Sequence, residues 1–312
     1  MQVAAHSSGN TNIAIVTVGE SEHVEYPAAM QKIDQLQIDY CAVLLRGIGI
    51  DTVDKFQDFL ACSPNPRLDY RHGNSPRSAV GDGIYTSTEY PPEYEITLHN
   101  ELSYAARWPH RLSFCCLVPA RVGGETPICD AGEMLRALSE PVRERFLSRG
   151  LLYRQNLHGG FGPGKSWQQT YNTDDQAEVE AYLRTEDVRY KWLPDGSLRT
   201  YQLRPASRRH STRLTEVWFN QAEQWHPSCL PLPEAEALRE IVENDEELPL
   251  SVVFGDGSPI SDADLAEVRR VAETNAFDVP WERGDVLVVD NMAAMHGRRP
   301  YEGDRQVLVA MS

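Results

Sequence analysis

Two histidines and one glutamate are the side chains of this sequence best suited to hold a metal ion. His99 and Glu101 are two positions apart in a segment, 98–102, that we expect to be a strand. Side chains two positions apart in a strand point to the same face, so both could bind one ion from one side. His296, after another apolar segment, is the candidate third ligand. Two imidazoles and a carboxylate on one face of an ion are typical of non-haem iron(II) oxygenases, whose open positions take cosubstrate and oxygen.

This three-residue pattern is a weak signal by itself, because His-x-Glu pairs are frequent on protein surfaces. A zinc hydrolase could use the same residue types, but its usual His-Glu-x-x-His helix is absent from the sequence. A metal-binding protein without turnover is another alternative. Asn100 is expected to point away from the two ligands and to be structural.

Composition and charge limit the class of partner. The 312 residues are 41% hydrophobic and 24% charged, which is ordinary for a soluble globular protein, and we expect one domain spanning residues 1–312. The net charge of −16 disfavours binding to nucleic acid or anionic membranes. The six cysteines form no regular framework, and we find neither a signal peptide nor an apolar run of about 20 residues. We therefore expect a cytoplasmic protein that acts on a small molecule, and we predict no oligomeric state.

Many short strands and few long helices indicate a mainly β fold with flanking helices (α+β), built on a β-barrel or jelly-roll core. A Gly- and Pro-rich region, 63–83, is expected to form long loops near a site. The helix expected at 131–149 is broken where Pro141 begins a second helix. Strands are expected at 13–18, 41–45, 112–118, 151–156, 187–192, 198–203, 215–220, 285–290 and 305–311, and further helices at 27–37, 51–61, 232–243 and 261–275.

Six stretches between residues 71 and 311 resemble, in order, the TauD/TfdA family of Fe(II)- and 2-oxoglutarate-dependent dioxygenases. The resemblance is greatest to the branch associated with syringomycin-type and other nonribosomal peptide pathways. The stretches are RHGNSPR (71–77), GIYTSTEYPPEYEITLHNELSY (83–104), GGETPICD (123–130), WFNQAEQWHPS (218–228), GDGSPI (255–260) and GDVLVVDNMAAMHGRRPYEGDRQVLVAM (284–311). Together they span residues 71 to 311, nearly the whole domain, and are far more specific than any single motif.

The resemblance implies a double-stranded β-helix core in which His99, Glu101 and His296 bind iron. Many family members carry Asp in the carboxylate position, and Glu101 is a known variation that leaves the chemistry intact. The resemblance also implies that Thr126 contacts the cosubstrate 2-oxoglutarate, and that O2 binds at the iron.

Arg305 matches the family's arginine that pairs with the distal carboxylate of 2-oxoglutarate. In a strand 305–311, alternation allows this side chain to point into the barrel with Val307. A planar guanidinium group suits a carboxylate in a partly dry pocket. Arg298 and Arg299 are competing candidates.

The activity implied is hydroxylation of an sp3 carbon, with succinate and carbon dioxide as co-products. Family analogy suggests an amino acid or a unit derived from one, either free or held as a thioester on a carrier protein. Desaturation and epoxidation are alternatives at the same iron centre. Related halogenases lack the carboxylate ligand, so the presence of Glu101 predicts hydroxylation and not chlorination.

A different class is suggested by Gly159–Ser166, which matches the phosphate-binding GxxxxGK[ST] loop, and by 286–290, an apolar segment ending in Asp. That loop must open directly into a helix, whereas residues 167–173 are poor helix formers and the next helix is expected from Asp174. The surrounding segments form no βαβ repeat. We therefore favour a Gly-rich loop over the oxygenase site, in which Lys165 could contact an anionic substrate.

Overall fold

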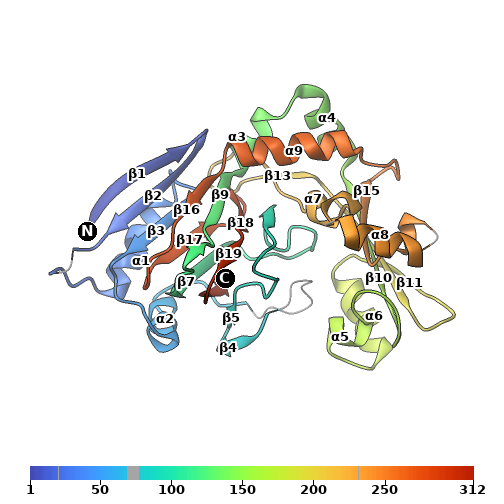
Figure 1. Ribbon diagram of the computed structural model, residues 1–312, viewed down its shortest axis with the longest axis horizontal. Coiled ribbons are helices and arrows are strands. Elements are labelled where there is room, and N and C mark those ends of the chain that lie inside the picture. The colour runs from blue at the N-terminus through green and yellow to red at the C-terminus, as the bar shows by residue number, and fades with distance from the viewer. Residues whose placement is uncertain (20, 69–76, 231, 243) are drawn as a thin grey trace.

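The structure is a computed structural model that describes residues 1–312 except for 20, 69–76, 231 and 243 (Figure 1). Residues 69–76, within the loop region expected at 63–83, lie outside the described residues, and they include most of the RHGNSPR stretch. Among the helices that the structure describes, none has the length and apolar composition needed to cross a membrane.

The first layer is an eight-stranded sheet. Its strands β2 and β3 are parallel, whereas β17 runs antiparallel to both β3 and β7. Residues 286–289 of β17 are completely buried, as expected for a β-branched strand with both faces covered. One face packs against helices α1 (Tyr26–Leu36) and α2 (Val53–Leu60). The strands in sheet order are β1 (Gln2–Ser8), β2 (Thr11–Thr17), β3 (Ala42–Arg46), β17 (Val286–Asp290), β7 (Arg111–Val118), β20 (Gln306–Met311), β5 (Ile84–Thr86) and β4 (Ala79–Gly81).

The second layer is a four-stranded sheet in the order β16 (Phe277–Val279), β9 (Thr126–Asp130), β18 (Ala294–Arg298) and β6 (Ile96–His99). Side chains from both sheets form one buried cluster, to which Leu287 and Val309 come from the first sheet and Ile128 and Ala294 from the second. The two sheets therefore pack face to face, as in a jelly roll, and β18 and β6 lie side by side at one edge of the core.

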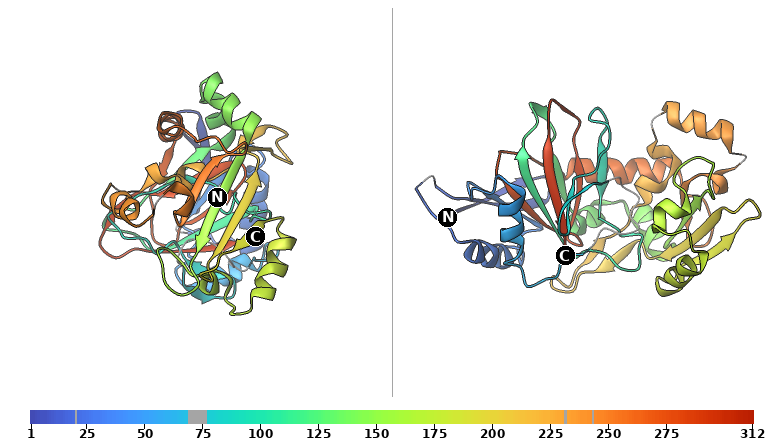
Figure 2. Two further views of the ribbon diagram at one scale, coloured as in Figure 1. Left: turned by 90° about the vertical axis from the view of Figure 1, so that its right-hand side faces the viewer. Right: turned by 90° about the horizontal axis from the view of Figure 1, so that it is seen from below.

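A third sheet lies at the opposite end of the molecule from β1 and β2 (Figure 2). Its order is β11 (Arg189–Trp192), β12 (Leu198–Arg204), β10 (Leu151–Leu157) and β15 (Leu250–Phe254). The remaining elements are α3 (Ala131–Ala137), α4 (Glu140–Arg149), α5 (Trp167–Tyr171), α6 (Gln176–Thr185), α7 (Ala222–Trp225), α8 (Leu232–Ile241), α9 (Asp262–Thr274), the 3-10 turns η1 (Pro227–Cys229) and η2 (Asp245–Glu247), and the strand pairs β13 (Ser207–Arg209) with β14 (Glu216–Trp218) and β8 (Val122–Gly123) with β19 (Tyr301–Glu302).

The buried cluster that includes α3, α4 and α9 joins the jelly roll to the third sheet. It contains Leu98, next to the candidate ligand His99, as well as Met295, Trp218 and Val252. The segment that carries the candidate ligands is therefore held between two cores. The side chain of Trp218 is buried in this cluster and is therefore part of the core and not of a binding surface.

Candidate metal and cosubstrate site

Glu101 lies in a turn, and not in the strand that we expected from the sequence. Strand β6 ends at His99, and Leu102 adopts a positive φ of 54°. The side-chain amide of Asn291 bonds both backbone groups of Glu101: Oδ1 accepts from the N–H at 2.7 Å, and Nδ2 donates to the carbonyl oxygen at 2.9 Å. The expectation from strand alternation was therefore wrong, because Asn291 takes the groups that would have continued the strand ladder.

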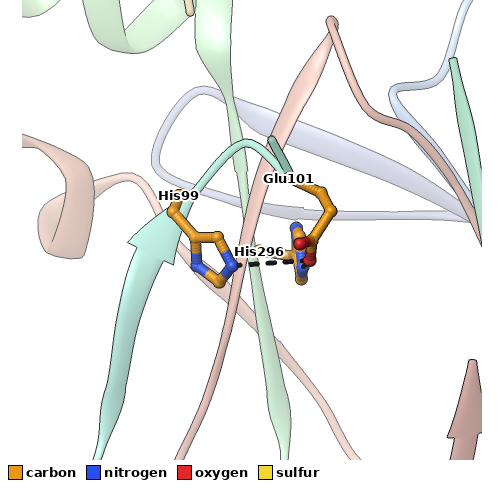
Figure 3. Close-up of side chains that lie close together, drawn as sticks. All are labelled: His99, Glu101 and His296. Atoms are coloured by element: carbon orange, nitrogen blue, oxygen red, sulfur yellow. Dashed lines mark ion pairs between the residues drawn. The ribbon is translucent and has the colours of Figure 1, made fainter. Parts of the chain in front are cut away.

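The three candidate metal ligands nevertheless converge (Figure 3). His296 on β18 pairs in register with His99 on β6, and their ring centroids are 4.4 Å apart. The Nε2 atom of each histidine lies 3.9 Å from Oε2 of Glu101. Each side chain thus offers one ligand atom, and the three atoms lie within 4.8 Å of one another. All three side chains are buried.

The protonation of the two histidines suits metal binding. Nδ1 of His99 lies 2.9 Å from the carbonyl oxygen of Thr97, which can only accept, so Nδ1 carries the proton and Nε2 presents a lone pair. Burial lowers the pKa of His99, and burial lowers the pKa of His296 well below its usual value. Two neutral imidazoles and one carboxylate are the ligand set that a labile iron(II) site requires, so the residues fit the ion.

One cavity connects these histidines with the two side chains expected to bind 2-oxoglutarate. Its lining includes His99, His296, Thr126 and Arg305. Oγ1 of Thr126, at the start of β9, accepts a hydrogen bond from Nε1 of Trp281 at 3.1 Å. Because a hydroxyl group can donate as well as accept, Thr126 retains a donor for a ligand oxygen.

Arg305 immediately precedes β20, which begins one residue later than expected. Its Nε donates to the carbonyl oxygen of Gly124 at 3.1 Å, and its Nη1 donates to Oγ of Ser87 at 3.3 Å. In the part of the chain that the structure describes, no carboxylate forms an ion pair with Arg305. Burial lowers the pKa of Arg305 to about 10, which shows that the charge is poorly compensated. Gly124 has a φ of +77°, and a Cβ there would lie 3.0 Å from Nε of Arg305, so glycine makes room for the guanidinium group.

The two competing arginines have other partners. Arg298 donates to three backbone carbonyl groups of one loop, those of Tyr90, Pro91 and Tyr94, at 2.7 to 2.9 Å. Arg299 forms ion pairs with three carboxylates, those of Glu95, Glu273 and Asp278. The three carboxylates compensate the charge of Arg299, which argues against Arg299 as the cosubstrate arginine. Arg298 lines the same cavity as Arg305, and its Nε has no hydrogen-bond partner among the described residues, but both of its Nη groups are already held by backbone carbonyl groups, which favours Arg305.

Residues 16–311 match the family described as "Taurine catabolism dioxygenase TauD, TfdA family". The chain belongs to this family. The dapdiamide synthesis protein DdaC of Enterobacter agglomerans is 34% identical over 305 residues, covering 97% of this chain and 92% of that protein. A clavaminate synthase-like protein of Arabidopsis thaliana is 31% identical over 287 residues, covering 89% and 83%. These matches confirm the family resemblance, and the relatives include a protein of a biosynthetic pathway.

As a member of this family, the protein is an Fe(II)- and 2-oxoglutarate-dependent oxygenase that uses O2. Its fold matches that of PvcB from Pseudomonas aeruginosa with a TM-score of 0.57 at 13% identity, covering 99% of this chain and 90% of PvcB. It also matches AAD-2, solved with Mn(II) and N-oxalylglycine, with a TM-score of 0.54 at 13% identity, covering 99% and 96%. The expected mainly β, jelly-roll fold is confirmed.

Sequence reasoning missed two residues of this TauD/TfdA site. One is Asn291, and the other is Arg77, whose Nη2 donates to Oε2 of Glu101 at 2.7 Å. Arg77 also lines the cavity, and its side chain is only 3% exposed. Both residues occur within the family-like stretches, but nothing in their spacing indicated a contact with Glu101.

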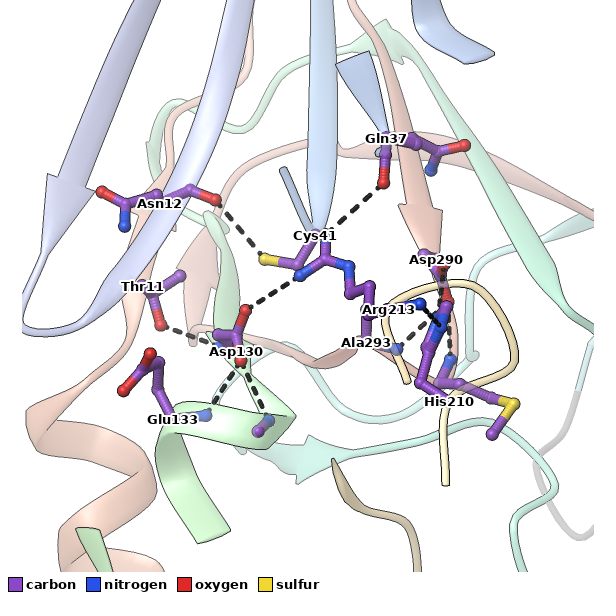
Figure 4. A network of polar contacts seen from close by, with 12 residues as sticks. Thr11, Asn12, Gln37, Cys41, Asp130, Glu133, His210, Arg213, Asp290 and Ala293 are labelled. Atoms are coloured by element: carbon purple, nitrogen blue, oxygen red, sulfur yellow. Dashed lines mark hydrogen bonds and ion pairs between the residues drawn. The ribbon is translucent and has the colours of Figure 1, made fainter. Parts of the chain in front are cut away.

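A separate polar network fixes the turn that leads to His296 (Figure 4). Asp290 ends β17, and its Oδ1 accepts from the backbone N–H groups of Met292 and Ala293 at 3.0 and 3.1 Å. Its Oδ2 lies 2.9 Å from Nε2 of His210. Asp290 therefore shapes the entry to β18, which gives the Asp at the end of this apolar strand a structural role.

The same network also contacts the second sheet of the jelly-roll core. Arg213, three residues after His210, donates to Oδ2 of Asp130 at 3.3 Å, and Oδ1 of Asp130 caps α3. One short segment, 210–213, thus holds the ends of β9 and β17, which belong to different sheets.

The glycine-rich segment Gly159–Ser166 does not form a nucleotide-binding loop. The preceding strand β10 pairs antiparallel with both β12 and β15, so the parallel βαβ context is missing. The expectation that residues 167–173 are not helical was wrong for α5, because Ser166 forms a capping box with Gln169. That bond engages the hydroxyl group that a phosphate-binding loop would use for magnesium.

Proposed function

We propose that this enzyme hydroxylates an sp3 carbon of an amino acid or a unit derived from one, free or bound to a carrier protein, in natural-product biosynthesis. The observation that carries this proposal is the convergence of His99, Glu101 and His296, two of which line a cavity together with Arg305. Its similarity to a dapdiamide synthesis protein supports a biosynthetic role. All six cysteines are free thiols, which supports a reducing, cytoplasmic setting.

The side chains of this site divide the work between metal and cosubstrate. His99, Glu101 and His296 hold the iron, Arg305 binds the distal carboxylate of 2-oxoglutarate, and Thr126 donates to another of its oxygens. Iron, 2-oxoglutarate and O2 together supply the oxidant that removes a hydrogen atom from the substrate and returns a hydroxyl group, leaving succinate and carbon dioxide.

A substrate screen by mass spectrometry tests the proposal. Purified enzyme is incubated with iron(II), ascorbate, 2-oxoglutarate and pools of amino acids or their carrier-protein thioesters. The expected product has gained one oxygen atom, in an amount equal to the succinate formed. A product that has lost two hydrogen atoms and gained no oxygen would show that the enzyme is a desaturase and not a hydroxylase.

A nucleotide-binding measurement tests the rival class directly. We expect no detectable binding of ATP with magnesium in calorimetry, because the loop at Gly159–Ser166 lacks the parallel sheet on which such sites depend.

A further inference from the structure

Strand β6, which carries His99, is an edge strand, and the short helix α7 packs against it. β6 pairs with β18 on one side and is the last strand of the second sheet. An edge strand leaves backbone carbonyl groups without a strand partner. Nε2 of Gln221 donates to the carbonyl oxygen of Asn100 at 3.1 Å, and Nε2 of Gln224 donates to that of Thr97 at 3.2 Å. The carbonyl groups before and after His99 are therefore both held by one short segment.

The carbonyl oxygen of Thr97 is shared between Gln224 and His99. It lies 3.2 Å from Nε2 of Gln224 and 2.9 Å from Nδ1 of His99. A carbonyl oxygen has two lone pairs, so it can accept both bonds. The group that receives the Nδ1 proton of a metal-binding histidine orients the ring and so sets the direction of Nε2. A shift of this carbonyl group would therefore move Nε2 away from the place where the three ligand atoms converge.

Helix α7 is itself fixed from two directions. Glu223 accepts from Nε of Arg269 in α9 at 2.9 Å, and it also accepts from the hydroxyl group of Thr97. The backbone N–H of Gln221 donates to the hydroxyl oxygen of Tyr153, in the third sheet, at 2.9 Å. A helix of four residues has little stability of its own, so these contacts determine where it lies. The helix can therefore act as a fixed support for β6.

We propose that Gln224 is a positioning residue for the metal ligand His99. Its amide holds the carbonyl group of Thr97, and this carbonyl group orients the imidazole ring, so Gln224 acts on the metal without touching it. The proposal gives a role to the family-like stretch 218–228, all of which the structure describes and none of which lines the cavity of His99 and Arg305. It rests on the proposed function in taking His99 as a metal ligand.

Co(II) binding to the whole enzyme tests the inference without turnover. Co(II) can occupy a site of two imidazoles and a carboxylate, and its visible spectrum changes with the arrangement of its ligands. Gln224→Met, which removes the donor at similar volume, should raise the dissociation constant for Co(II) about 10- to 100-fold, the usual effect of losing an outer partner of a ligand. The visible bands should shift as well. Gln224→Lys retains a donor and should recover part of the affinity and of the spectrum.

Gln168→Met is the matched control. Nε2 of Gln168 also donates to a backbone carbonyl oxygen, that of Gly159, at 3.1 Å, and its side chain is half-buried like that of Gln224. This variant should bind Co(II) with the affinity and the spectrum of the unmodified enzyme. Denaturant unfolding of both variants without metal separates a general loss of stability from an effect on the metal site.

Three results would overturn the inference. An unchanged Co(II) affinity and spectrum in Gln224→Met would show that Gln224 only covers the edge of β6. Equal weakening in Gln168→Met would trace the effect to general stability and not to His99. Equal weakening in Gln224→Met and Gln224→Lys would show that the donated hydrogen bond is not the cause. If the unmodified enzyme itself binds no Co(II), the proposed metal site fails, which is a separate outcome.

Discussion

Both ends of the side-chain amide of Asn291 form hydrogen bonds with the backbone of Glu101. Oδ1 accepts from the backbone N–H of Glu101 at 2.7 Å, and Nδ2 donates to its carbonyl oxygen at 2.9 Å and to that of Pro109 at 2.8 Å. Asn291 is completely buried and comes from the turn after β17, far from Glu101 in sequence. The position of the candidate metal ligand Glu101 therefore depends on a residue that is itself outside the candidate ligand set.

Asn291→Ala should lower both stability and metal affinity. Loss of three buried hydrogen bonds leaves backbone groups unpaired, and we expect the free energy of unfolding to fall by about 2–4 kcal/mol. Mn(II) affinity should fall as well, because the turn that presents Glu101 is no longer fixed. Denaturant unfolding and calorimetry measure the two effects. Asn244→Ala, at an exposed cap of η2, is the control, and Mn(II) binding by Asn291→Ala equal to that of this control would refute the idea.

His99→Ala and His296→Ala should each abolish iron binding and succinate formation while the fold survives. Either change leaves only two of the three ligands, and an imidazole lost from a buried pocket cannot be replaced by a nearby side chain. Metal content, succinate yield and far-UV circular dichroism are the measurements. His23→Ala, at an exposed side chain outside the site, should behave like the unmodified enzyme. Full turnover by either ligand variant would rule out the triad.

Arg305→Ala should raise the apparent KM for 2-oxoglutarate at least about 100-fold, because breaking a buried charged pair typically costs about 3–5 kcal/mol. Iron affinity should change little, since Arg305 contacts no metal ligand directly. Arg299→Ala removes an ion-paired arginine and should leave this KM near its normal value. The reverse pattern between the two variants would assign the cosubstrate to Arg299.

Arg305→Met should stabilise the ligand-free protein. Burial lowers the pKa of Arg305 to about 10, below that of an ordinary arginine, so the unfolded chain binds its proton more tightly and the charge opposes folding at neutral pH. We expect the free energy of unfolding to rise by about 1–3 kcal/mol in Arg305→Met, a gain that disappears as the pH rises above about 10. Unfolding curves without 2-oxoglutarate test this, and a destabilised variant would contradict it.

Glu101 should decide the chemical outcome once a substrate is known. In the proposed site its carboxylate would fill the coordination position that chloride uses in related halogenases, so the product in chloride buffer should be hydroxylated. Mass spectrometry distinguishes a gain of oxygen from a gain of chlorine. A chlorinated product from the unmodified enzyme would overturn this prediction.

The elements that are readable from sequence are those whose own residues determine them. Residues 286–289 form an apolar run with β-branched side chains, and the strand there, Val286–Asp290, begins one residue later than the expected 285–290. Pro141 likewise separates α3 from α4, as expected. Strand β1 was missed, because its residues are almost all exposed and it is specified mainly by pairing with β2.

The residues of the candidate site could be predicted from the sequence only in part, for a related reason. The types of His99, Glu101 and His296 indicate metal chemistry, and the family resemblance supplied Arg305. By contrast, Asn291 acts on the backbone of a residue far away in sequence, and local patterns carry no information on such contacts. Strand periodicity failed at Glu101 because a tertiary hydrogen bond replaced the ladder.

The register of His296 against His99 also has a consequence for how the protein is made. The two histidines are almost two hundred residues apart, and their strands pair directly. Pairing over such a separation closes a long loop, which makes it a slow and late step in folding. The proposed ligand set is therefore complete only after β18 has docked on β6, and we expect partly folded chains to bind no iron.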